Sequence, residues 1–366
     1  MFQKKADIAI VIPTFNAAET TITLLKRLES QRNIVFDVIL IDAGISKDYK
    51  QISRIKTKFN ILIKHLKVDN GSAGSFYYGE KIAYEMGYDY IILEDNDAVP
   101  ISKKLVYELV KNCKPEVATV PSNILIHKKN KNTILIKQFA FHFLTLHKDM
   151  IKRIGLIRKD LFTFGDDAEY TRRISNTFKL ERLENIFYKH RAGIDIFLTE
   201  LLRFRPLYYG IRNNILIANG IRNKLAIAMS YLFIFFPISL KTNKEQFSKL
   251  NYIVLRAIFD GIIGKTGRAK IKVYKTSNEV CSIKLVRAQK RVPSNRGGYF
   301  MIGKNRKGYV RNYQLLKLFL SGMKIVVDNN VESSISYRIL PFLLVGRLYI
   351  IKDGAVYKTF ISCISN

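Results

Sequence analysis

Two aspartates one residue apart, Asp95 and Asp97, directly follow the apolar run at 90–93 and its neighbour Glu94. Two carboxylates spaced in this way in a turn can both face one divalent cation, and Mg²⁺ and Mn²⁺ prefer such oxygen ligands. A cation of this kind neutralises the charge that develops when a diphosphate group leaves. A solvated turn or a helix N-cap explains most isolated pairs of this type, but the position at the end of a predicted strand favours a cation site.

A second acidic pair, Asp166 and Asp167, opens a predicted helix, where acidic side chains are favoured in the first turn. A carboxylate there, if close to the cation site, can take the proton from an attacking hydroxyl group. The pattern alone favours a plain helix cap. His190 follows a predicted strand, and a neutral imidazole can complete a metal site built on two aspartates. A hydrogen-bonded surface histidine is the alternative for this residue.

Buried strands alternate with helices in the first half of the chain and place these side chains. Unbroken apolar runs of this kind are typical of parallel strands covered on both faces, and their alternation with helices predicts an open α/β sheet. Ligands bind beyond the carboxyl ends of such strands. The predicted strands are 8–12, 36–41, 61–68 and 90–93, and the polar groups at their ends are Pro13-Thr14, Asp42, the loop at 70–74, and Asp95-Asn96-Asp97.

The rest of the chain changes character twice. A strand at 117–120, a hairpin of 124–126 with 133–136, and a strand at 183–188 are expected before a helical, apolar part that spans about 197–264. Short strands then dominate. We therefore predict three domains: 1–196 for the α/β sheet, 197–268 for a helical segment, and 269–366 for a small β-rich domain.

The formal net charge of +31 over 366 residues is extreme and is spread along the whole chain. A nucleic acid, an anionic membrane or a polyanionic substrate would balance it. We expect no nucleic-acid partner, because no binding signature is visible and acidic strand ends repel phosphates unless a cation intervenes. The apolar stretch 225–240 is short for a membrane span and has basic flanks, which predicts either an interfacial or a buried helix. Three scattered cysteines and no signal peptide predict a cytoplasmic setting.

Eight motifs in one order resemble those of the family 2 glycosyltransferases, over roughly residues 6–268. The resemblance implies the GT-A fold, a Rossmann-like, mostly parallel sheet flanked by helices. Within the family the chain is most similar to the rhamnosyltransferase and galactofuranosyltransferase branch. The motifs are VIPTFN at 11–16, ILID at 39–42, NGSAG at 70–74, IILEDNDA at 91–98, FGDDAEYTRR at 164–173, HRAG at 190–193, YYGIRNN at 208–214 and DGIIGKTG at 260–267.

The resemblance also implies roles for individual residues. It makes Asp167 the catalytic base of an inverting transfer, and it implies Mn²⁺ or Mg²⁺ as the cofactor. The metal ligands would be Asp95, Asp97 and His190, and the acceptor-binding residues Asp166 and Glu169. The donor-binding residues would be Pro13, Thr14, Asp42, Asn70, Gly74, Asp95 and Asn96. One departure weakens the nucleotide contact at Asp42: an alanine, a glycine and an isoleucine follow it, where the family often has asparagine and serine.

The expected function is transfer of a rhamnose- or galactofuranose-like sugar from a UDP- or dTDP-sugar to a growing, lipid-linked surface glycan. We expect the protein on the inner face of the plasma membrane, bound to its anionic surface. The sequence is also compatible with a homo-oligomer. A sugar nucleotidyltransferase is one alternative, but residues 16–19 lack the Gly-rich phosphate loop usual in that class. A non-catalytic basic protein that binds membrane or nucleic acid is the other, and it leaves the acidic strand end unexplained.

Overall fold

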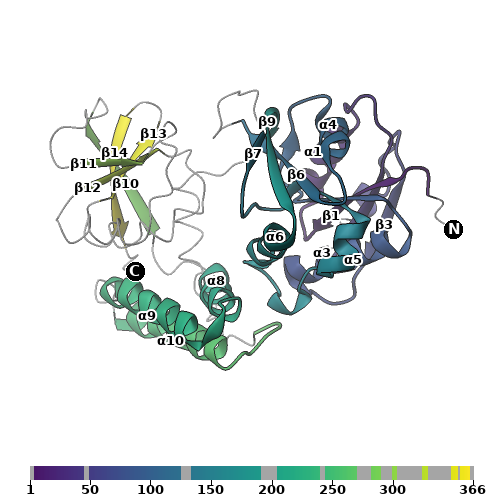
Figure 1. Ribbon diagram of the computed structural model, residues 1–366. Helices are drawn as coiled ribbons and strands as arrows, with labels where there is room; N and C mark the ends of the chain where they lie inside the picture. The colour runs from purple at the N-terminus through teal and green to yellow at the C-terminus, as the bar shows by residue number, and fades with distance from the viewer. Residues whose placement is uncertain are drawn as a thin grey trace. The chain divides into compact units, whose positions relative to one another are not determined.

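The computed structural model describes residues 4–44, 49–124, 133–190, 204–239 and 244–269, followed by five separate strands between residues 282 and 362 (Figure 1). The chain forms two compact units, which are residues 1–191 with 266–269, and residues 192–265 with 270–366. The three-domain division at residues 196 and 268 stays a prediction. The two units are described separately below.

A nine-stranded sheet forms the centre of the first unit. Its order is β3-β2-β1-β4-β8-β6-β9-β5, with β7 beside β9. The four strands β1 to β4 are parallel to one another, as the alternation of strands and helices predicts. The strands are β1 Ile8–Thr14, β2 Asp37–Asp42, β3 Ile61–His65, β4 Tyr90–Glu94, β5 Val99–Pro100, β6 Val117–Asn123, β7 Thr133–Leu135, β8 His142–His147 and β9 Lys179–Lys189.

The second half of this sheet is mixed. Strand β8 lies antiparallel between β4 and β6, and β6 continues in parallel to β9. Strand β7 pairs with the first part of β9, and the expected hairpin of 124–126 with 133–136 depends on residues outside the described part. Residues 125–132 lie outside the described part. Strand β9 is also longer than the predicted 183–188, since it has β6 on one edge and both β7 and β5 on the other.

Both faces of the sheet are buried, which explains the unbroken apolar runs. In β1, the side chains of Ile8, Ile10 and Ile12 enter one core cluster, while Ala9 and Val11 enter the other. Helices α1 and α4 contribute to the first cluster, and α3, α5 and α6 to the second. These helices are α1 Ala18–Leu28, α3 Gly71–Glu85, α4 Leu105–Asn112, α5 Lys148–Ile154 and α6 Asp166–Thr177, and the short elements are α2 Tyr49–Ile52 and η1 Lys159–Leu161.

The described part of the second unit contains three helices, within the range 197–264 predicted to be helical, and a separate five-stranded sheet. The helices are α8 Phe204–Leu216, α9 Gly220–Ser239 and α10 Lys244–Ile262, and the sheet order is β10-β14-β13-β12-β11. Helix α10 packs against both α8 and α9. No described helix is long and apolar enough to cross a bilayer. The strands are β10 Ser282–Gln289, β11 Tyr299–Ile302, β12 Lys324–Asp328, β13 Leu348–Lys352 and β14 Ala355–Ser362, and the strand expected at 271–274 lies outside the described residues.

Candidate active site

The carboxyl ends of neighbouring strands bring the predicted polar residues to one edge of the sheet. Thr14 ends β1 and lies in register with Asp42 at the end of β2. On the other side of β1, strand β4 ends at Glu94. The order β2-β1-β4 therefore places three polar strand ends side by side, at the edge where ligands bind in open α/β sheets.

Glu94 and Asp95 are adjacent in sequence but have different surroundings. Glu94 is fully buried, and its carboxylate accepts a hydrogen bond from the backbone N–H of Phe143. Burial, followed by the charge of Asp95, raises the pKa of Glu94 well above its ordinary value. Asp95 donates its backbone N–H to the carbonyl of Phe141 at 2.8 Å. These contacts hold the end of β4 against β8, so Glu94 supports the turn that presents Asp95 and Asp97.

Asp97, His142 and His190 form a group of side chains that can hold a metal ion, with one ligand atom of each residue within 4.8 Å of the others. His190 Nε2 lies 3.2 Å from Asp97 Oδ2, and the two imidazole rings have centroids 4.3 Å apart. His142 Nε2 lies 3.7 Å from Asp95 Oδ2, so Asp95, the other aspartate of the pair, borders this group. The structure thus brings together Asp95, Asp97 and His190, the three residues that the sequence suggested as ligands.

The protonation states of His142 and Asp97 suit a cation. Burial, followed by the charge of His190, lowers the pKa of His142 to about 3, so its ring is neutral. For Asp97, burial raises the pKa, but the hydrogen bond and charge of His190 outweigh it and the pKa is lowered. The buried Nδ1 of His190 has no hydrogen-bond partner among the described residues. A neutral imidazole and an ionised carboxylate are the forms that coordinate metals, and the residues present therefore fit a divalent ion.

His142 is the residue that sequence reasoning missed. It begins β8, and its Nδ1 lies 2.9 Å from the hydroxyl group of Tyr188 in β9, a contact that fixes the ring. The alternation along 142–147 and the small number of histidines, five in the chain, were the signals that could have pointed to it. Its position beside His190 follows only from the pairing of β8 between β4 and β6.

Two predicted donor residues, Thr14 at the end of β1 and Asn96 after β4, are linked by hydrogen bonds through Thr21. The hydroxyl group of Thr14 lies 2.9 Å from that of Thr21 in α1, and the amide of Asn96 donates to the same Thr21 hydroxyl at 3.2 Å. Pro13 precedes Thr14 within β1 and is half-buried. This contact between α1 and the β4–β5 turn ties the end of β1 to the cation group.

Asp42 is buried at the end of β2 and accepts two contacts. Its Oδ1 accepts the backbone N–H of Gly44 at 3.0 Å, and its Oδ2 lies 2.7 Å from Nδ1 of His65, at the end of β3. The structure therefore holds this carboxylate in place at the strand end without the asparagine and serine that often follow it in the family. His65 is a further polar group at this edge that the sequence reading did not single out.

The loop before α3 meets the segment before α6. Asn70 is the N-cap residue of α3, and its side chain donates to the carbonyl of Val68 at 3.0 Å. The hydroxyl of Ser72 donates to Thr163 Oγ1 at 3.1 Å and lies 3.5 Å from Asp166 Oδ2. The helix N-terminus at 70–74, with Gly74 in its first turn packed on Asn70, thereby lies next to the second acidic pair.

Asp166 and Asp167 share the electrostatic environment of the first acidic pair. Burial raises the pKa of Asp166 to about 7, with the charge of Asp167 as the next cause. Burial also raises the pKa of Asp167. The pKa of Asp95 is raised well above its ordinary value by burial, then by Asp97, Asp166 and Asp167. The two acidic pairs are therefore close enough to repel each other, as expected for carboxylates gathered around a cation.

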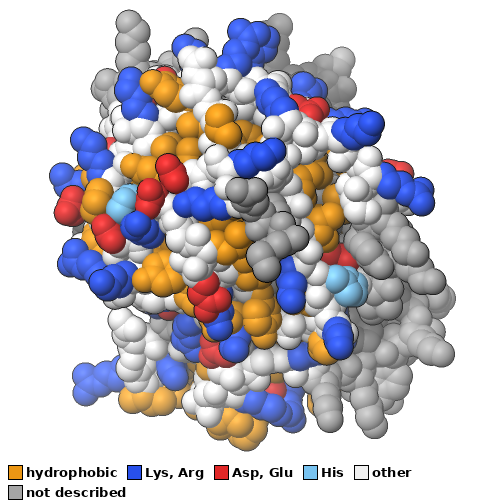
Figure 2. Space-filling model, turned by 90° about the vertical axis from the view of Figure 1, so that its right-hand side faces the viewer, with side chains coloured by type: hydrophobic (Ala, Val, Ile, Leu, Met, Phe, Trp, Pro, Cys, Tyr) orange, Lys and Arg blue, Asp and Glu red, His pale blue; other side chains and the backbone are white. Residues whose placement is uncertain are grey.

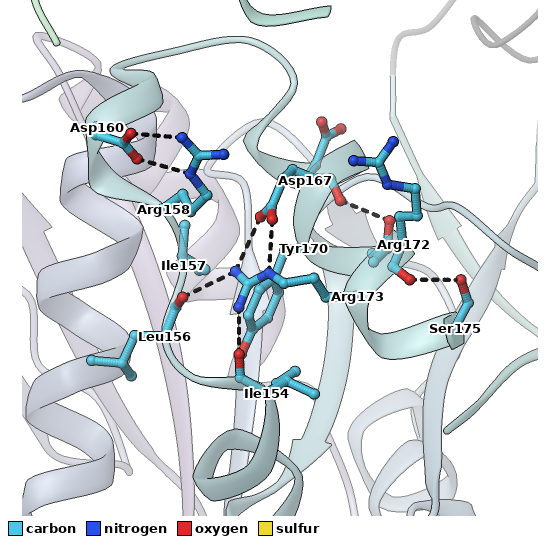
Figure 3. A network of polar contacts seen from close by, with 12 residues as sticks. Ile154, Leu156, Ile157, Arg158, Asp160, Asp167, Tyr170, Arg172, Arg173 and Ser175 are labelled. Atoms are coloured by element: carbon cyan, nitrogen blue, oxygen red, sulfur yellow. Dashed lines mark hydrogen bonds and ion pairs between the residues drawn. The ribbon is translucent and has the colours of Figure 1, made fainter. Parts of the chain in front are cut away.

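Glu169 pairs with Arg173. The ion pair measures 2.8 Å from Nε to Oε1, and Nη2 of Arg173 also donates to Oε2 at 3.0 Å. Figure 3 shows the same guanidinium donating to the carbonyls of Ile154 and Leu156, while the carboxylate of Asp167 points out of this network. The acceptor-binding role of Glu169 stays a prediction, and its carboxylate is engaged in anchoring α6.

Residues 9–174 match the model of a family described as Glycosyl transferase family 2. No curated protein sequence matches the chain. The family match agrees with the sheet described above and confirms the predicted fold class, an α/β GT-A sheet flanked by helices and followed by helical and β-rich parts.

Solved structures with similarity to the chain are distant. GalNAc-T7 with UDP, GalNAc and Mn²⁺ is 14% identical, with a TM-score of 0.42, over 50% of this chain and 44% of that one. TarS 1-349 of S. aureus is 13% identical, with a TM-score of 0.46, over 70% and 80%. The mannosyltransferase PcManGT of Pyrobaculum calidifontis, in complex with GDP-Man and Mn²⁺, is 11% identical, with a TM-score of 0.45, over 70% and 87%. The chain spans less than half of GalNAc-T7, and TM-scores this low transfer no residue role to it.

Proposed function

We propose that the protein is a metal-dependent, inverting glycosyltransferase, because residues 9–174 match the Glycosyl transferase family 2 model. The observation that supports this most strongly is the group of Asp97, His142 and His190. It lies at the carboxyl end of β4, the neighbour of β1, and Asp95, which borders it, is within electrostatic range of Asp167. One edge of the sheet thus holds the candidate residues for binding the donor, for binding the cation and for acting as the base.

The donor set favours Mn²⁺ over Mg²⁺. Magnesium prefers oxygen ligands and retains several waters, whereas imidazole nitrogen suits transition metals. Two of the three candidate ligands, His142 and His190, are imidazoles, and Asp97 supplies a carboxylate oxygen, with Asp95 as the neighbouring acid. The bound ion would supply positive charge to a departing diphosphate. A protein with this set is expected to bind Mn²⁺ more tightly than Mg²⁺.

The chemical step assigned to the chain's own residues is a proton transfer. The carboxylate of Asp167 takes the proton from the acceptor hydroxyl as the new bond from that oxygen to the anomeric carbon forms. The bond from that carbon to the nucleoside diphosphate breaks, and the diphosphate keeps the electron pair. A single displacement of this kind inverts the anomeric centre. Burial raises the pKa of Asp167, which brings a carboxylate closer to the range that suits a general base near neutral pH.

For the donor, we propose a UDP- or dTDP-activated sugar of the rhamnose or galactofuranose type, in line with the resemblance in the motifs. Thr14, Asp42 and Asn96 lie at the sheet edge where the base and ribose would be held. Asn70 and Gly74 lie at the start of α3, beside the second acidic pair. The sugar would then lie next to the α3 N-terminus and Asp166.

For the acceptor, we propose a growing, lipid-linked glycan at the inner face of the plasma membrane. The net charge of +31 supports an anionic membrane surface as partner. Free nucleic acid is not proposed, because the site edge carries the carboxylates of Asp95, Asp97, Asp166 and Asp167.

The test is a panel of UDP- and dTDP-sugars, each with Mn²⁺, with Mg²⁺ and with neither, read as thermal shift and as donor hydrolysis or transfer. A donor and a metal that bind the native state raise its melting temperature. Asp97→Asn and His142→Ala should each remove the Mn²⁺-dependent shift and lower the rate about 100-fold or more.

The matched control is Asp149→Asn, an aspartate in α5 with a histidine neighbour, His147, outside the site. It should behave as the unmodified protein. Unchanged activity in Asp97→Asn would reject the metal assignment. Release of pyrophosphate from a nucleoside triphosphate, without sugar transfer, would reject the glycosyltransferase in favour of a nucleotidyltransferase.

A further inference from the structure

Helix α9 exposes a row of large apolar side chains. Ile221, Leu225, Met229 and Phe233 follow one another at intervals of four residues, so they lie along one side of the helix. Phe233 is the most exposed of them, at 77%. The helix already buries Ala228, Tyr231 and Phe235 in its own unit, so this row is not needed for packing against α8 and α10.

Helix α10 and the residue that follows it expose a second such row. Tyr252, Leu255, Phe259 and Ile263 are spaced by three and four residues, and each is more than half exposed. The opposite side of the helix is buried through residues that include Leu250, Val254 and Ala257. Of the 17 large hydrophobic side chains exposed in the described residues, eight are in these two rows. Scattered exposed apolar residues are ordinary, but ordered rows of this kind indicate a contact surface.

The charges around both rows have one sign. Arg222 and Lys224 lie in the first turns of α9, and Lys249 and Arg256 lie on α10. The single acidic group among the described side chains of the two helices, Asp260, is buried and bonded by Tyr208 and Arg256. Figure 2 shows apolar side chains at the lower edge of the molecule with Lys and Arg side chains next to them. Exposed apolar rows with basic residues, and no exposed acid among the described side chains of the two helices, match an anionic bilayer surface.

We propose that the exposed rows of α9 and α10, named here the α9/α10 face, dock the protein on an anionic lipid bilayer. The inference rests on the proposed function in one respect: docking would bring the enzyme to its lipid-linked acceptor. The apolar side chains enter the boundary between headgroups and acyl chains, and the basic residues contact lipid phosphates. Docking without insertion agrees with the absence of a spanning helix among the described residues.

A second copy of the chain is a poorer occupant than a bilayer. A symmetric contact through the α9/α10 face would bring Arg222, Lys224, Lys249 and Arg256 close to their own copies with no exposed acid to offset them in the described side chains of these helices. Like charges at an interface oppose association, whereas an anionic leaflet attracts the same residues.

The test is sedimentation of the full chain with vesicles of phosphatidylcholine alone or of phosphatidylcholine with an equal amount of phosphatidylglycerol. The variants are Leu225→Glu with Phe233→Glu, and Leu255→Glu with Phe259→Glu. The control is Val35→Glu with Leu135→Glu, which are 65% and 64% exposed in the first unit and give the same change of charge. We expect the unmodified protein and the control to bind the mixed vesicles, and each helix variant to bind about tenfold or more weakly.

Three results would overturn the proposal. They are no binding of the unmodified protein to the mixed vesicles, equal binding by the helix variants and the control, or a change from dimer to monomer in the helix variants with vesicle binding unchanged. Circular dichroism and melting temperature confirm that each variant is folded. Mn²⁺-dependent donor hydrolysis, measured without vesicles, should be the same in all of them. If the unmodified protein shows no donor hydrolysis, that result counts against the proposed function. The docking is then still decided by the vesicle experiment.

Discussion

Asp167 is the residue on which the proposed chemistry depends most. It lies in the first turn of α6, and its Oδ1 accepts the backbone N–H of Ala168 at 2.7 Å. In Figure 3 its carboxylate lies apart from the contacts that anchor the rest of the helix. A carboxylate held by its own backbone, rather than by a side-chain cation, can accept a proton without first breaking an ion pair.

Asp167→Asn should lower the rate of sugar transfer by about 10²- to 10⁴-fold, the usual contribution of a general base. The amide has nearly the same shape, so the rise in melting temperature caused by donor and Mn²⁺ should remain. Asp7→Asn, at an exposed aspartate paired with Lys4, serves as the control and should leave the rate unchanged. Loss of the thermal shift together with the rate would show that Asp167 acts in binding instead.

For single residues, the sequence identified most of the side chains that gather at the candidate active site. Asp95 and Asp97 stand out because two acids follow a buried strand, and Asp167 because a helix starts with acids. His142 could not be found in this way, since an isolated histidine at the start of a strand has no pattern of its own. What makes it a candidate ligand is a neighbour, His190, that is 48 positions away in the chain and contacts it only in the folded sheet.

A buried carboxyl group connects helices α3 and α6 by hydrogen bonds, and no sequence motif predicted it. Glu80 in α3 is fully buried and accepts hydrogen bonds from the hydroxyl of Tyr170 and, at 2.8 Å, from the backbone N–H of Ile157. Arg173 lies over the ring of Tyr170, 4.8 Å from its centroid. Because Tyr170 is one turn after Asp166 and Asp167, this contact positions the start of α6 against α3.

Glu80→Gln should change how stability depends on pH. Burial raises the pKa of Glu80 from 4.5 to about 7, against the lowering effect of its hydrogen bonds and of Arg173. Between these values the unfolded chain has lost the proton that the folded chain retains, so the unfolding free energy falls as pH rises. The loss is at most about 3 kcal/mol. The amide of the variant stays neutral and lacks this loss, as denaturation at several pH values can measure. Parallel pH profiles for the two proteins would contradict the prediction.

The first residue of α3 depends on glycine. Gly71 has φ of +70°, and a Cβ placed there would lie 1.9 Å from the carbonyl oxygen of Phe162. That carbonyl also accepts the backbone N–H of Ala73 at 3.1 Å. A side chain at this position therefore has to push the start of α3 away from the segment that leads into Asp166.

Gly71→Ala should lower the unfolding free energy by about 2 kcal/mol or more and weaken donor binding, because it adds a backbone clash to the cost of a positive φ. Gly87→Ala is the matched control, since Gly87 has φ of +74° and no atom within 4 Å of the added Cβ. It should cost only about 1 kcal/mol and leave donor binding unchanged. Equal effects of the two substitutions on stability, by chemical denaturation, would contradict the prediction.

Strands whose two faces are both buried could be predicted from the sequence. Strands β1, β2 and β4 were found because both of their faces are covered, which leaves an unbroken apolar run. Strand β8 was missed, and the pairing of β7 with β9 was not predicted. Both lie in the mixed half of the sheet, where pairing joins segments far apart in the chain.

At the scale of the whole molecule, the chain returns to its first unit after the helices. Residues 266–269 belong to that unit. The backbone N–H of Gly267 donates to the carbonyl of Asp160 at 2.6 Å, and Arg268 lies 3.9 Å from Asp69. Asp69 in turn accepts the backbone N–H of Gly71 at 2.9 Å. The short return segment thus braces the loop that begins α3.

A chain that ends after Ala269 should retain the donor- and Mn²⁺-induced thermal shift, because every described contact of the site lies within it. A chain that ends after Gly264 should lose about 1 kcal/mol of stability, a few degrees in melting temperature, since two polar contacts to the first unit are removed. Its donor-induced shift should also be smaller. Equal thermal shifts in the two truncated chains would show that the return segment is not needed.

The sequence by itself determined the α/β class, the strand ends that carry acids, and the order of motifs that resembles the family 2 glycosyltransferases, because each of these depends on local periodicity or on neighbours a few residues apart. The tertiary structure decided that His142 joins Asp97 and His190, that Glu169 anchors α6 through Arg173, and that residues 266–269 return to the first unit. Each of these is a contact between segments that the sequence places far apart or leaves unpaired. A pattern along one segment specifies which side chains are presented, and only the packing of several segments specifies what they meet.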